Sequence, residues 1–414
     1  MIAGWNTHSI NDCCEILDSQ RVPLNAEQRS IIPGDIPYYG ANGIQGYINQ
    51  YLFDEDLILM AEDGGNFDQF ATRPIAYKIS GKSWVNNHAH ILKAKNGFNQ
   101  DFVFYSIVHK NILYFIQGGT RSKLNQSDLK SIILQIPNSE TEQSTIATIL
   151  TTIDQAIEKT EQLIAKYERI KTGLMQDLLT RGIDEQGNIR SEETHEFKDS
   201  VLGRIPKEWD VVSFSSVSDV IDSLHKTPSY SDNGYSMVRG TEIYDGFLDD
   251  SILENAPKVS PNVYSEFTEK YCPQSGDILM TRVGSYGVTC LVDTKTPFCL
   301  GQNTVVINAK SVDSFFLYYV SKAEYISRQI ELNLAGSSQK TLSLGHIRKL
   351  KLGLPKDEDE QERISETIFN ADKSIISYRS QLRKLQKNKT GLMQDLLTGK
   401  VRVDALMNQI KETL

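Results

Sequence analysis

The chain has 414 residues, 39% hydrophobic and 23% charged, which is the composition of an ordinary globular protein with room for about two to four cores. Its formal net charge of −9 excludes a protein that simply coats nucleic acid, because Lys and Arg must neutralise phosphates in that kind of binding. If DNA is the target, basic residues must lie on local faces, or partner subunits must supply part of the phosphate contact.

The termini and cysteines exclude further classes. The first residues lack the basic start and apolar run of a signal peptide, and no stretch reaches the roughly 18 apolar residues of a membrane span, so we expect a cytoplasmic protein without membrane contact. Five cysteines, with Cys13 and Cys14 adjacent and no CxxC spacing, fit neither a disulfide framework nor a zinc site. They are expected to be buried free thiols.

The first third of the chain alternates strand-like runs with polar loops. The apolar run 57–60 precedes an acidic, glycine-rich loop at 62–68, and polar stretches with interleaved aromatic residues occur at 38–43 and 84–90. Loops held by a rigid sheet are suited to contacting a partner, although a polar glycine-rich loop is most often only a turn.

A strand and a long helix follow. Residues 132–136 form a strand-like run that ends at Pro137, and Ser139 with Glu142 three residues later predicts a helix start of the capping-box kind. From Ile146, steps of four and three residues fall mostly on apolar side chains until Arg181 and Gly182 signal the end. A spacing of 3.5 residues over about five heptads is typical of a coiled-coil seam, and about 40 residues give a helix of roughly 60 Å.

The second half repeats this order. Strand-like run 277–280 precedes a polar loop at 281–287, and run 350–354 ends at Pro355. Asp357 with Glu360 predicts another helix start, and the seam from Ile364 ends before Gly399. Each seam carries one lysine at the same step, Lys171 in the first helix and Lys389 in the second.

The two helices are copies of each other. Residues 171–180 read KTGLMQDLLT, and residues 389–398 read KTGLMQDLLT again, 218 residues later. The same register aligns Pro137 with Pro355 and Glu142 with Glu360, whereas Trp5 matches Trp209 only at an offset of 204. Each half is therefore a constant part plus a variable part. We expect the two helices to pair within one chain; packing of each helix on its own domain, or pairing with a second chain, is the alternative.

Two sets of residues are candidates for contact with DNA. Asn and Gln can read adenine, and Arg can read guanine, by bidentate hydrogen bonds in the major groove, whereas hydroxyls, glycine amides and cations suit phosphate oxygens. The candidate base contacts are Tyr39, Asn42, Asn66, Asn86, Asn87, His88, Arg239, Arg282, Ser285, Tyr286, Gln302 and Asn303. The candidate phosphate contacts are Thr120, Arg121, Lys123, Ser337, Ser338 and Lys340, which occupy matching glycine-rich segments of the two halves.

Catalytic signatures do not appear. An N6-adenine methyltransferase needs an acidic or amide residue followed by two prolines and an aromatic, and the chain has no Pro-Pro pair. Gly81-Lys82-Ser83 fails as a phosphate loop because the required first glycine falls on Ala76. His88 and His90 lack a cysteine or carboxylate at ligand spacing, so we expect no metal site, and no carboxylate-carboxylate-lysine nuclease set is evident.

The chain resembles the specificity subunit of type I restriction-modification enzymes over essentially its whole length. The resemblance is carried by FKDSVLGRIPKEW at 197–209, by Gly276-Asp277-Ile278-Leu279-Met280, by the Glu-Gln pairs that open each helix, and by GLMQDLLTGKVRV at 391–403. The first copy departs from the pattern, because it begins at Gly4-Trp5 without the Ile-Pro-x-x-Trp lead-in.

The resemblance implies an α+β protein. It has two mixed α/β target-recognition domains, joined and spaced by two long conserved helices that form an antiparallel coiled coil with a pseudo-twofold internal repeat. The implied division places the first target-recognition domain at 1–136, a conserved helical region and linker at 137–196, the second target-recognition domain at 197–354 and the second helical region at 355–414.

The implied function is a non-catalytic reader of a bipartite sequence in double-stranded DNA. The implied partners are methyltransferase (modification) subunits and restriction/translocase subunits. No cofactor is expected in this chain, and those partners are expected to use S-adenosylmethionine, ATP and Mg²⁺. Two other hypotheses remain at this point: a tandem-repeat coiled-coil scaffold whose variable domains bind proteins, and a stand-alone enzyme.

Overall fold

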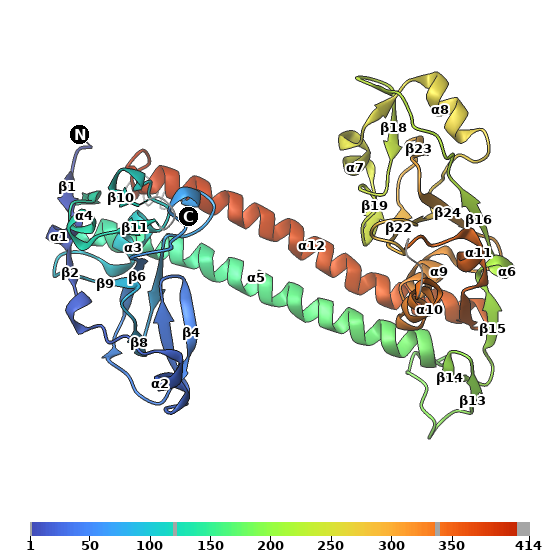
Figure 1. Ribbon diagram of the computed structural model, residues 1–414, viewed down its shortest axis with the longest axis horizontal. Helices are drawn as coiled ribbons and strands as arrows, with labels where there is room; N and C mark the ends of the chain where they lie inside the picture. The colour runs from blue at the N-terminus through green and yellow to red at the C-terminus, as the bar shows by residue number, and fades with distance from the viewer. Residues whose placement is uncertain (1, 119–121, 336–339, 404–414) are drawn as a thin grey trace, which may run out of the picture. The chain divides into compact units, whose positions relative to one another are not determined.

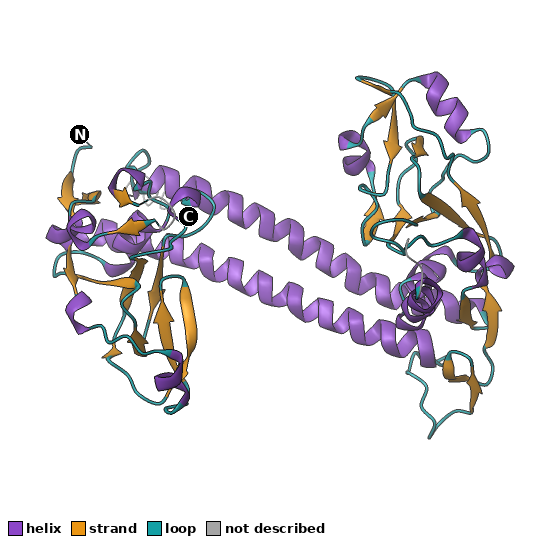
Figure 2. Ribbon diagram, viewed as in Figure 1, coloured by secondary structure: helices purple, strands orange, loops and turns teal. Residues whose placement is uncertain are grey.

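The structure is a computed structural model that describes residues 2–118, 122–335 and 340–403. Contacts divide the chain into two compact units, Met1–Glu161 with Arg379–Leu414, and Gln162–Tyr378. Each unit combines a mixed domain of strands and short helices with half of each long helix (Figures 1 and 2). The predicted α+β class with an internal repeat is confirmed, whereas the boundaries predicted at 136, 196 and 354 stay predictions. Among the described residues, no helix has the length and apolar character needed to cross a membrane.

The first unit holds two four-stranded sheets, ordered β2-β9-β6-β7 and β4-β3-β8-β5, and a strand pair β1-β12. Its strands are β1 Trp5–Ser9, β2 Cys14–Ile16, β3 Ile36–Gly40, β4 Gly43–Ile48, β5 Phe53–Asp54, β6 Leu57–Ala61, β7 Ala76–Ile79, β8 Lys82–Val85, β9 Ala89–Ala94, β10 Ile116–Gln117, β11 Lys123–Leu124 and β12 Ile133–Pro137. Its short helices are α1 Ile10–Cys13, α2 Ala26–Ser30, α3 Gln100–Val108 and α4 Gln126–Lys130.

The second unit holds a five-stranded sheet β16-β24-β21-β22-β19, a four-stranded sheet β17-β20-β18-β23 and a strand pair β15-β25. Its strands are β13 Phe197–Ser200, β14 Gly203–Pro206, β15 Asp210–Ser213, β16 Ser218–Asp222, β17 Tyr230–Ser231, β18 Tyr235–Val238, β19 Gly246–Leu248, β20 Lys258–Val259, β21 Ile278–Thr281, β22 Thr289–Val292, β23 Phe298–Leu300, β24 Thr304–Ala309 and β25 Lys351–Leu354. Its short helices are α6 Phe214–Val217, α7 Asp250–Asn255, α8 Pro261–Thr268, α9 Ser314–Ser321, α10 Glu324–Leu334 and α11 Leu344–Lys349.

The long helices begin and end where the sequence predicts. Helix α5 is Glu140–Arg181 and helix α12 is Glu358–Leu396. The Ser139 hydroxyl accepts a hydrogen bond from the Glu142 amide at 3.3 Å, and Gly182 follows α5 with φ +68°. A left-handed residue is a common helix stop that glycine adopts without a Cβ penalty. The capping box itself is not completed, because the Glu142 carboxylate bonds to a different group, described below.

The predicted seam is the buried face of both helices. All ten positions of each seam are buried or half-buried, whereas the intervening positions of the helices are mostly exposed. The ends of the seams enter the domain cores: Ile146 and Leu150 pack with the first domain, and Ile364 and Ile368 with the second. Burial of each such aliphatic side chain stabilises the fold by about 1.5–3 kcal/mol.

Within each unit the two helix segments lie side by side and antiparallel (Figure 1). In the first unit Lys389 Nζ lies 2.6 Å from Asp154 Oδ1, and in the second Lys171 Nζ lies 2.7 Å from Asp372 Oδ1. The residue numbers of the two pairs rise in one helix as they fall in the other, as antiparallel pairing requires. Intramolecular pairing and packing on the domains, which the sequence presented as alternatives, therefore occur together.

A buried glutamate ties each helix start to its domain. In the first unit Glu142 accepts hydrogen bonds from Trp5 Nε1 at 3.3 Å and from Arg402 Nε and Nη2 at 2.7 and 2.8 Å. In the second, Glu360 accepts from Trp209 Nε1 at 3.2 Å and pairs with Arg190. The same three residue types thus recur at offsets of 218, 204 and 212, so the segment after α12 occupies the role that the linker after α5 has in the other unit.

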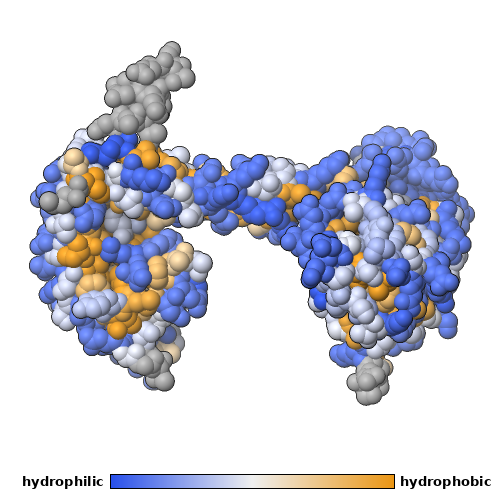
Figure 3. Space-filling model, turned by 90° about the horizontal axis from the view of Figure 1, so that it is seen from above, coloured by the Kyte–Doolittle hydropathy of each residue, from blue (hydrophilic) through white to orange (hydrophobic). Residues whose placement is uncertain are grey.

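The cysteines are free, as predicted. Cys13, Cys14, Cys290 and Cys299 are buried and Cys272 is half-buried. Burial raises the pKa of the Cys290 and Cys299 thiols to about 12, so both stay protonated near neutral pH. On the visible face in Figure 3, the exposed surface of the long helices is mainly hydrophilic, consistent with apolar side chains turned into the seam.

Candidate nucleic-acid interface

In both domains an equivalent set of strands holds the loops at one end of one sheet, called here the main sheet. This sheet is β2-β9-β6-β7 in the first domain and β16-β24-β21-β22-β19 in the second. Strands β6 and β9 are antiparallel neighbours in the first domain, as are β21 and β24 in the second. Just beyond the paired strands, the Glu62 amide donates to the His88 carbonyl at 2.8 Å, and the Arg282 amide donates to the Asn303 carbonyl at 2.9 Å. Glu62 and Arg282 are therefore equivalent positions, as are His88 and Asn303.

The predicted phosphate segment reaches the same end. The Leu124 amide donates to the Glu62 carbonyl at 2.7 Å, and the Leu342 amide donates to the Arg282 carbonyl at 2.9 Å. Lys123 Nζ lies 3.3 Å from Glu62 Oε1. The structure thus brings the base-contact loops beside the segments that carry the phosphate candidates.

The phosphate candidates themselves are only partly visible. Lys123 and Lys340 are exposed, whereas Thr120, Arg121, Ser337 and Ser338 lie outside the described residues.

The loop that follows β2 in the first domain, and the loop that follows β16 in the second, lie at the same end of the main sheet. Strand β2 pairs with β9 and β16 pairs with β24 in matching registers, which makes Asp18 equivalent to Asp222. Three residues later, Arg21 and His225 each approach the aspartate of their own domain. These four residues were not predicted from the sequence, although their common offset of 204, which is also that of Trp5 and Trp209, was a usable signal.

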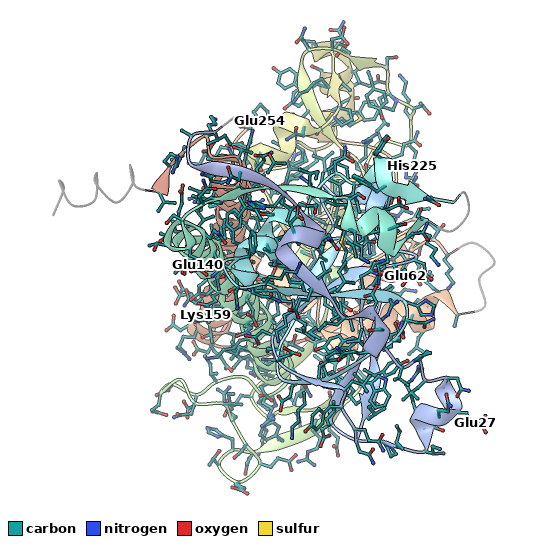
Figure 4. The ribbon with its side chains drawn as sticks, turned by 90° about the vertical axis from the view of Figure 1, so that its left-hand side faces the viewer. Glu27, Glu62, Glu140, Lys159, His225 and Glu254 are labelled. Carbon is teal, nitrogen blue, oxygen red and sulfur yellow. The ribbon has the colours of Figure 1, made fainter. Side chains whose placement is uncertain are left out.

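In the first domain these residues form a buried charge cluster. His90 Nδ1 lies 2.6 Å from Asp18 Oδ2 and Nε2 lies 2.8 Å from the Leu124 carbonyl oxygen. Arg21 Nη1 donates to Glu62 Oε2 at 2.6 Å. Burial raises the pKa of Asp18, but hydrogen bonds and charge from His90, with Gln126 and the Ile91 amide, outweigh it and hold the pKa below its ordinary value. Glu62 is approached by two cations, Arg21 and Lys123. Glu62 is labelled in Figure 4.

This cluster has the donor types of a metal site but not the free lone pairs. Asp18, Glu62 and His90 are the only residues in the described part of the chain whose donor atoms gather within metal-ligand range. Both ring nitrogens of His90 are already engaged, Nδ1 with the Asp18 carboxyl group and Nε2 with the Leu124 carbonyl, so neither is free to coordinate a cation. The geometry therefore favours a structural role for His90.

A polar cleft of about 530 Å³ opens beside the cluster in the first domain. It contains four predicted residues, Asn42, Asn86, Asn87 and His88, and brings them together from two separate loops. Its lining residues are Pro23, Leu24, Asn25, Arg29, Tyr38, Ala41, Asn42, Gln45, Asp63, Gly64, Asn86, Asn87 and His88. Amides dominate its polar groups, and Gln45, Asp63 and Arg29 were not predicted.

The side chains around this cleft differ in their hydrogen-bond partners and in their exposure. Asn86 is 3% exposed, donates to Gln45 Oε1 at 3.0 Å and accepts from the His88 amide at 2.8 Å, so it supports the turn. His88 Nδ1 lies 3.0 Å from Asp63 Oδ2. Asn42 donates to the Gly64 carbonyl at 3.0 Å. Asn87 is exposed at the tip of the turn.

The other two candidates of the first domain are Asn66, on its own loop, and Tyr39, on the strand beside the turn. Asn66 donates to the Pro74 carbonyl at 3.3 Å, which holds its own loop together. The Tyr39 carbonyl accepts from the Asn86 amide at 3.0 Å, and burial raises the pKa of the Tyr39 hydroxyl.

In the second domain the predicted arginines are held by carboxylates. Arg282 donates to Asp222 Oδ1 at 2.7 Å and to the Leu342 carbonyl at 2.9 Å, and its side chain is 11% exposed. Arg239 pairs with Glu242 through Nε and Nη2 at 3.1 and 2.6 Å. His225, labelled in Figure 4, is exposed beside Asp222.

The remaining candidates of the second domain lie on its loops. Gln302 Nε2 is 3.5 Å from Thr227 Oγ1. Ser285 and Asn303 are exposed, and Asn303 adopts φ +64°. Tyr286 packs partly against the core.

Comparison with known proteins agrees with this geometry. The MjaVIII type I restriction enzyme specificity subunit of Methanocaldococcus jannaschii is 25% identical over 97% of this chain and 94% of its own. A putative type I restriction enzyme specificity subunit of Haemophilus influenzae is 25% identical over 87% of this chain and 88% of its own.

A solved structure shares the fold. The crystal structure of a type I restriction-modification S subunit from M. genitalium aligns with 95% of this chain and 96% of that one, with a TM-score of 0.67 and 14% identity. The family model described as the type I restriction modification DNA specificity domain matches residues 2–169 and 206–386. With two copies of that domain over most of its length, the chain belongs to the type I restriction-modification DNA specificity family, as a non-catalytic specificity subunit.

Proposed function

We propose that this chain reads a bipartite DNA sequence, one half with each domain, and assembles with methyltransferase and restriction/translocase subunits in the cytoplasm. One observation carries the proposal: both domains present loops from the same strand frame, yet the side chains on those loops differ, Glu62 against Arg282 and His88 against Asn303. Two domains with the same strand frame but different loop side chains are suited to reading different sequences. The frame would position the loops on the DNA, and the loop side chains would determine which bases are recognised.

The charge of the chain supports assembly with partners. A net charge of −9 gives little general attraction to phosphates, and several cations at the strand ends are neutralised by neighbouring carboxylates. Partner subunits would supply further phosphate contacts, together with the chemistry that uses S-adenosylmethionine, ATP and Mg²⁺.

The first experiment measures sequence-specific binding. The full chain, alone and with its methyltransferase subunit, is titrated against a duplex carrying one split target and against a scrambled duplex at moderate salt. The proposal expects preferential binding of the split target. Equal affinity for both duplexes would contradict it and favour a scaffold that binds proteins.

A domain exchange tests the division of labour. Replacing residues 210–340 with the corresponding segment of a relative should change one half of the recognised sequence and leave the other half unaltered. A change in both halves would refute independent reading by the two domains.

Helix length tests the proposed spacing role of the helices. Inserting one heptad into both α5 and α12 keeps the seam in phase and adds about 10 Å of helix. The tolerated spacer between the half-sites should lengthen. An unchanged spacer would show that the helices do not set the distance.

A further inference from the structure

The turn before β9 in the first domain, residues 86–88, and the turn before β24 in the second, residues 301–303, carry a side-chain amide at the same position. Since His88 is equivalent to Asn303, the preceding residues Asn87 and Gln302 are also equivalent. Both follow a buried residue: the Asn86 amide donates to Gln45 and accepts from the His88 amide, and Gly301 has a Cβ position only 3.0 Å from Arg239 Cγ. The turn therefore buries its first residue, and its second residue is exposed in the first domain (Asn87) and half-buried in the second (Gln302).

Neighbouring charged side chains in the first domain are already paired. Asp63 lies against His88, and Glu62 is held by Arg21 and Lys123. The other charged side chain of the cleft, Arg29, donates to the Leu24 carbonyl at 2.9 Å and lies over the Tyr38 ring. The exposed Asn87 amide, beside the cleft that also contains Gln45 and Asn42, offers a donor and an acceptor side by side.

In the second domain the charged neighbours of the turn are likewise paired, although the residues differ. Arg282 is tied to Asp222 and to the Leu342 carbonyl, and Arg239 is tied to Glu242. The Gln302 amide has only a 3.5 Å contact with Thr227, at the long limit for a hydrogen bond. Its oxygen and nitrogen can therefore turn toward a ligand at little cost.

We propose that Asn87 and Gln302 are the adenine-reading residues of the two domains, each forming a bidentate pair with adenine N6 and N7 in the major groove. Asp18 in one domain and Asp222 in the other, each paired with a cation, are positioning residues for these turns. The inference rests on the proposed function and deepens it. It makes each half-site contain an adenine at the position that its turn contacts.

Selection from a randomised duplex library by the full chain, with its methyltransferase subunit present, measures the preference at every position of both halves. Asn87→Ala is expected to lower the preference for adenine at one position of one half by at least about fivefold, and Gln302→Ala to do the same in the other half only. Asn49→Ala and Asn262→Ala are matched controls, because each removes an exposed amide of the same domain outside this turn. Both controls should leave the selected sequence unchanged.

A charge variant gives a readout that a loss of stability cannot imitate. Gln302→Glu replaces the amide by an acceptor-only group, and a carboxylate accepts from the cytosine N4 amino group. The preferred base at that single position should therefore move from adenine toward cytosine. Hydrogen exchange of both units checks that each variant retains its fold.

The outcomes separate the two proposals. If the unaltered chain selects no sequence, the proposed function is wrong and the adenine assignment with it. If it selects a split sequence that Asn87→Ala and Gln302→Ala leave unchanged, or weaken equally at all positions, only the adenine assignment is overturned.

Discussion

The buried pair between Glu360 and Arg190 should contribute strongly to the stability of the second unit. The two side chains are 3% and 8% exposed, and Glu360 also accepts from Trp209 Nε1 and the Ile183 amide, both at 3.2 Å. Glu360→Gln removes the buried negative charge and leaves the Arg190 guanidinium only the exposed carboxylate of Glu208, whose Oε2 lies 3.4 Å from Arg190 Nη2. Removing one partner of a buried pair costs about 3–5 kcal/mol, and glutamine keeps one acceptor, so we expect a loss of about 3 kcal/mol.

The matched control is Glu358→Gln. Glu358 lies in the first turn of the same helix but is exposed, so its substitution removes the same favourable interaction with the helix dipole, about 0.3–1 kcal/mol, without opening a buried pair. Hydrogen exchange followed by mass spectrometry reports the opening free energy of each unit separately, which a single unfolding midpoint of a two-unit chain does not. Equal destabilisation by the two variants would refute the reasoning. The double variant Glu360→Gln with Arg190→Met should recover part of the loss, because it removes the stranded cation.

Three further predictions follow from buried charges. Lys171→Leu should destabilise the helix pair by about 1–2 kcal/mol in urea unfolding, because it removes the cation that pairs with Asp372, whose side chain is only 10% exposed. Adding Asp372→Leu to the same chain should restore much of the lost stability. Arg402→Gln should increase hydrogen exchange in the first unit and not the second, whereas Lys400→Gln, on the exposed surface of the same segment, should change neither; a uniform response would argue against a specific role of Arg402. Asp18 has a folded-state pKa below its ordinary 3.8, so its contribution to stability is present above that pH and is lost as the pH falls through the lowered value. Asp18→Asn should therefore make the first unit less stable at pH 7 and less sensitive to acid below pH 3.8, as measured by unfolding at each pH.

The lysine prediction corrects a simple expectation from the heptad pattern. A lysine in an otherwise apolar seam suggests that leucine would stabilise the pair. The structure places Asp372 and Asp154 opposite the two lysines, and Tyr319 and Tyr105 donate to the same carboxylates at 2.8 Å. The aspartates were visible in the sequence as a matched pair 218 residues apart, but the register of antiparallel helices that brings them to the lysines was not.

The candidate interface was predictable in part. Polar composition predicts loops 62–68 and 84–90 as contact loops, and the structure brings them together because the strands they follow and precede are neighbours in one sheet. Which residue of a turn is buried could not be read from composition: Asn86 and Asn87 are identical in type, yet one supports the turn and the other is exposed. Loop composition does not indicate Asp18 and Asp222, because they lie before the glycine-rich loops, at an offset that differs from that of the helices.

The sequence by itself determined the duplication, the two helices with their starts, stops and seams, and the absence of methyltransferase and nuclease signatures, because these depend on local spacing that survives in a linear chain. Only the tertiary structure decided which side chains meet at the ends of the sheets and at the ends of the helices. Those contacts join residues that lie 41 positions apart for Arg21 and Glu62 and 170 positions apart for Arg190 and Glu360. The loops between them differ in length, so one sequence offset cannot align them, and strand register and helix packing bring these residues together.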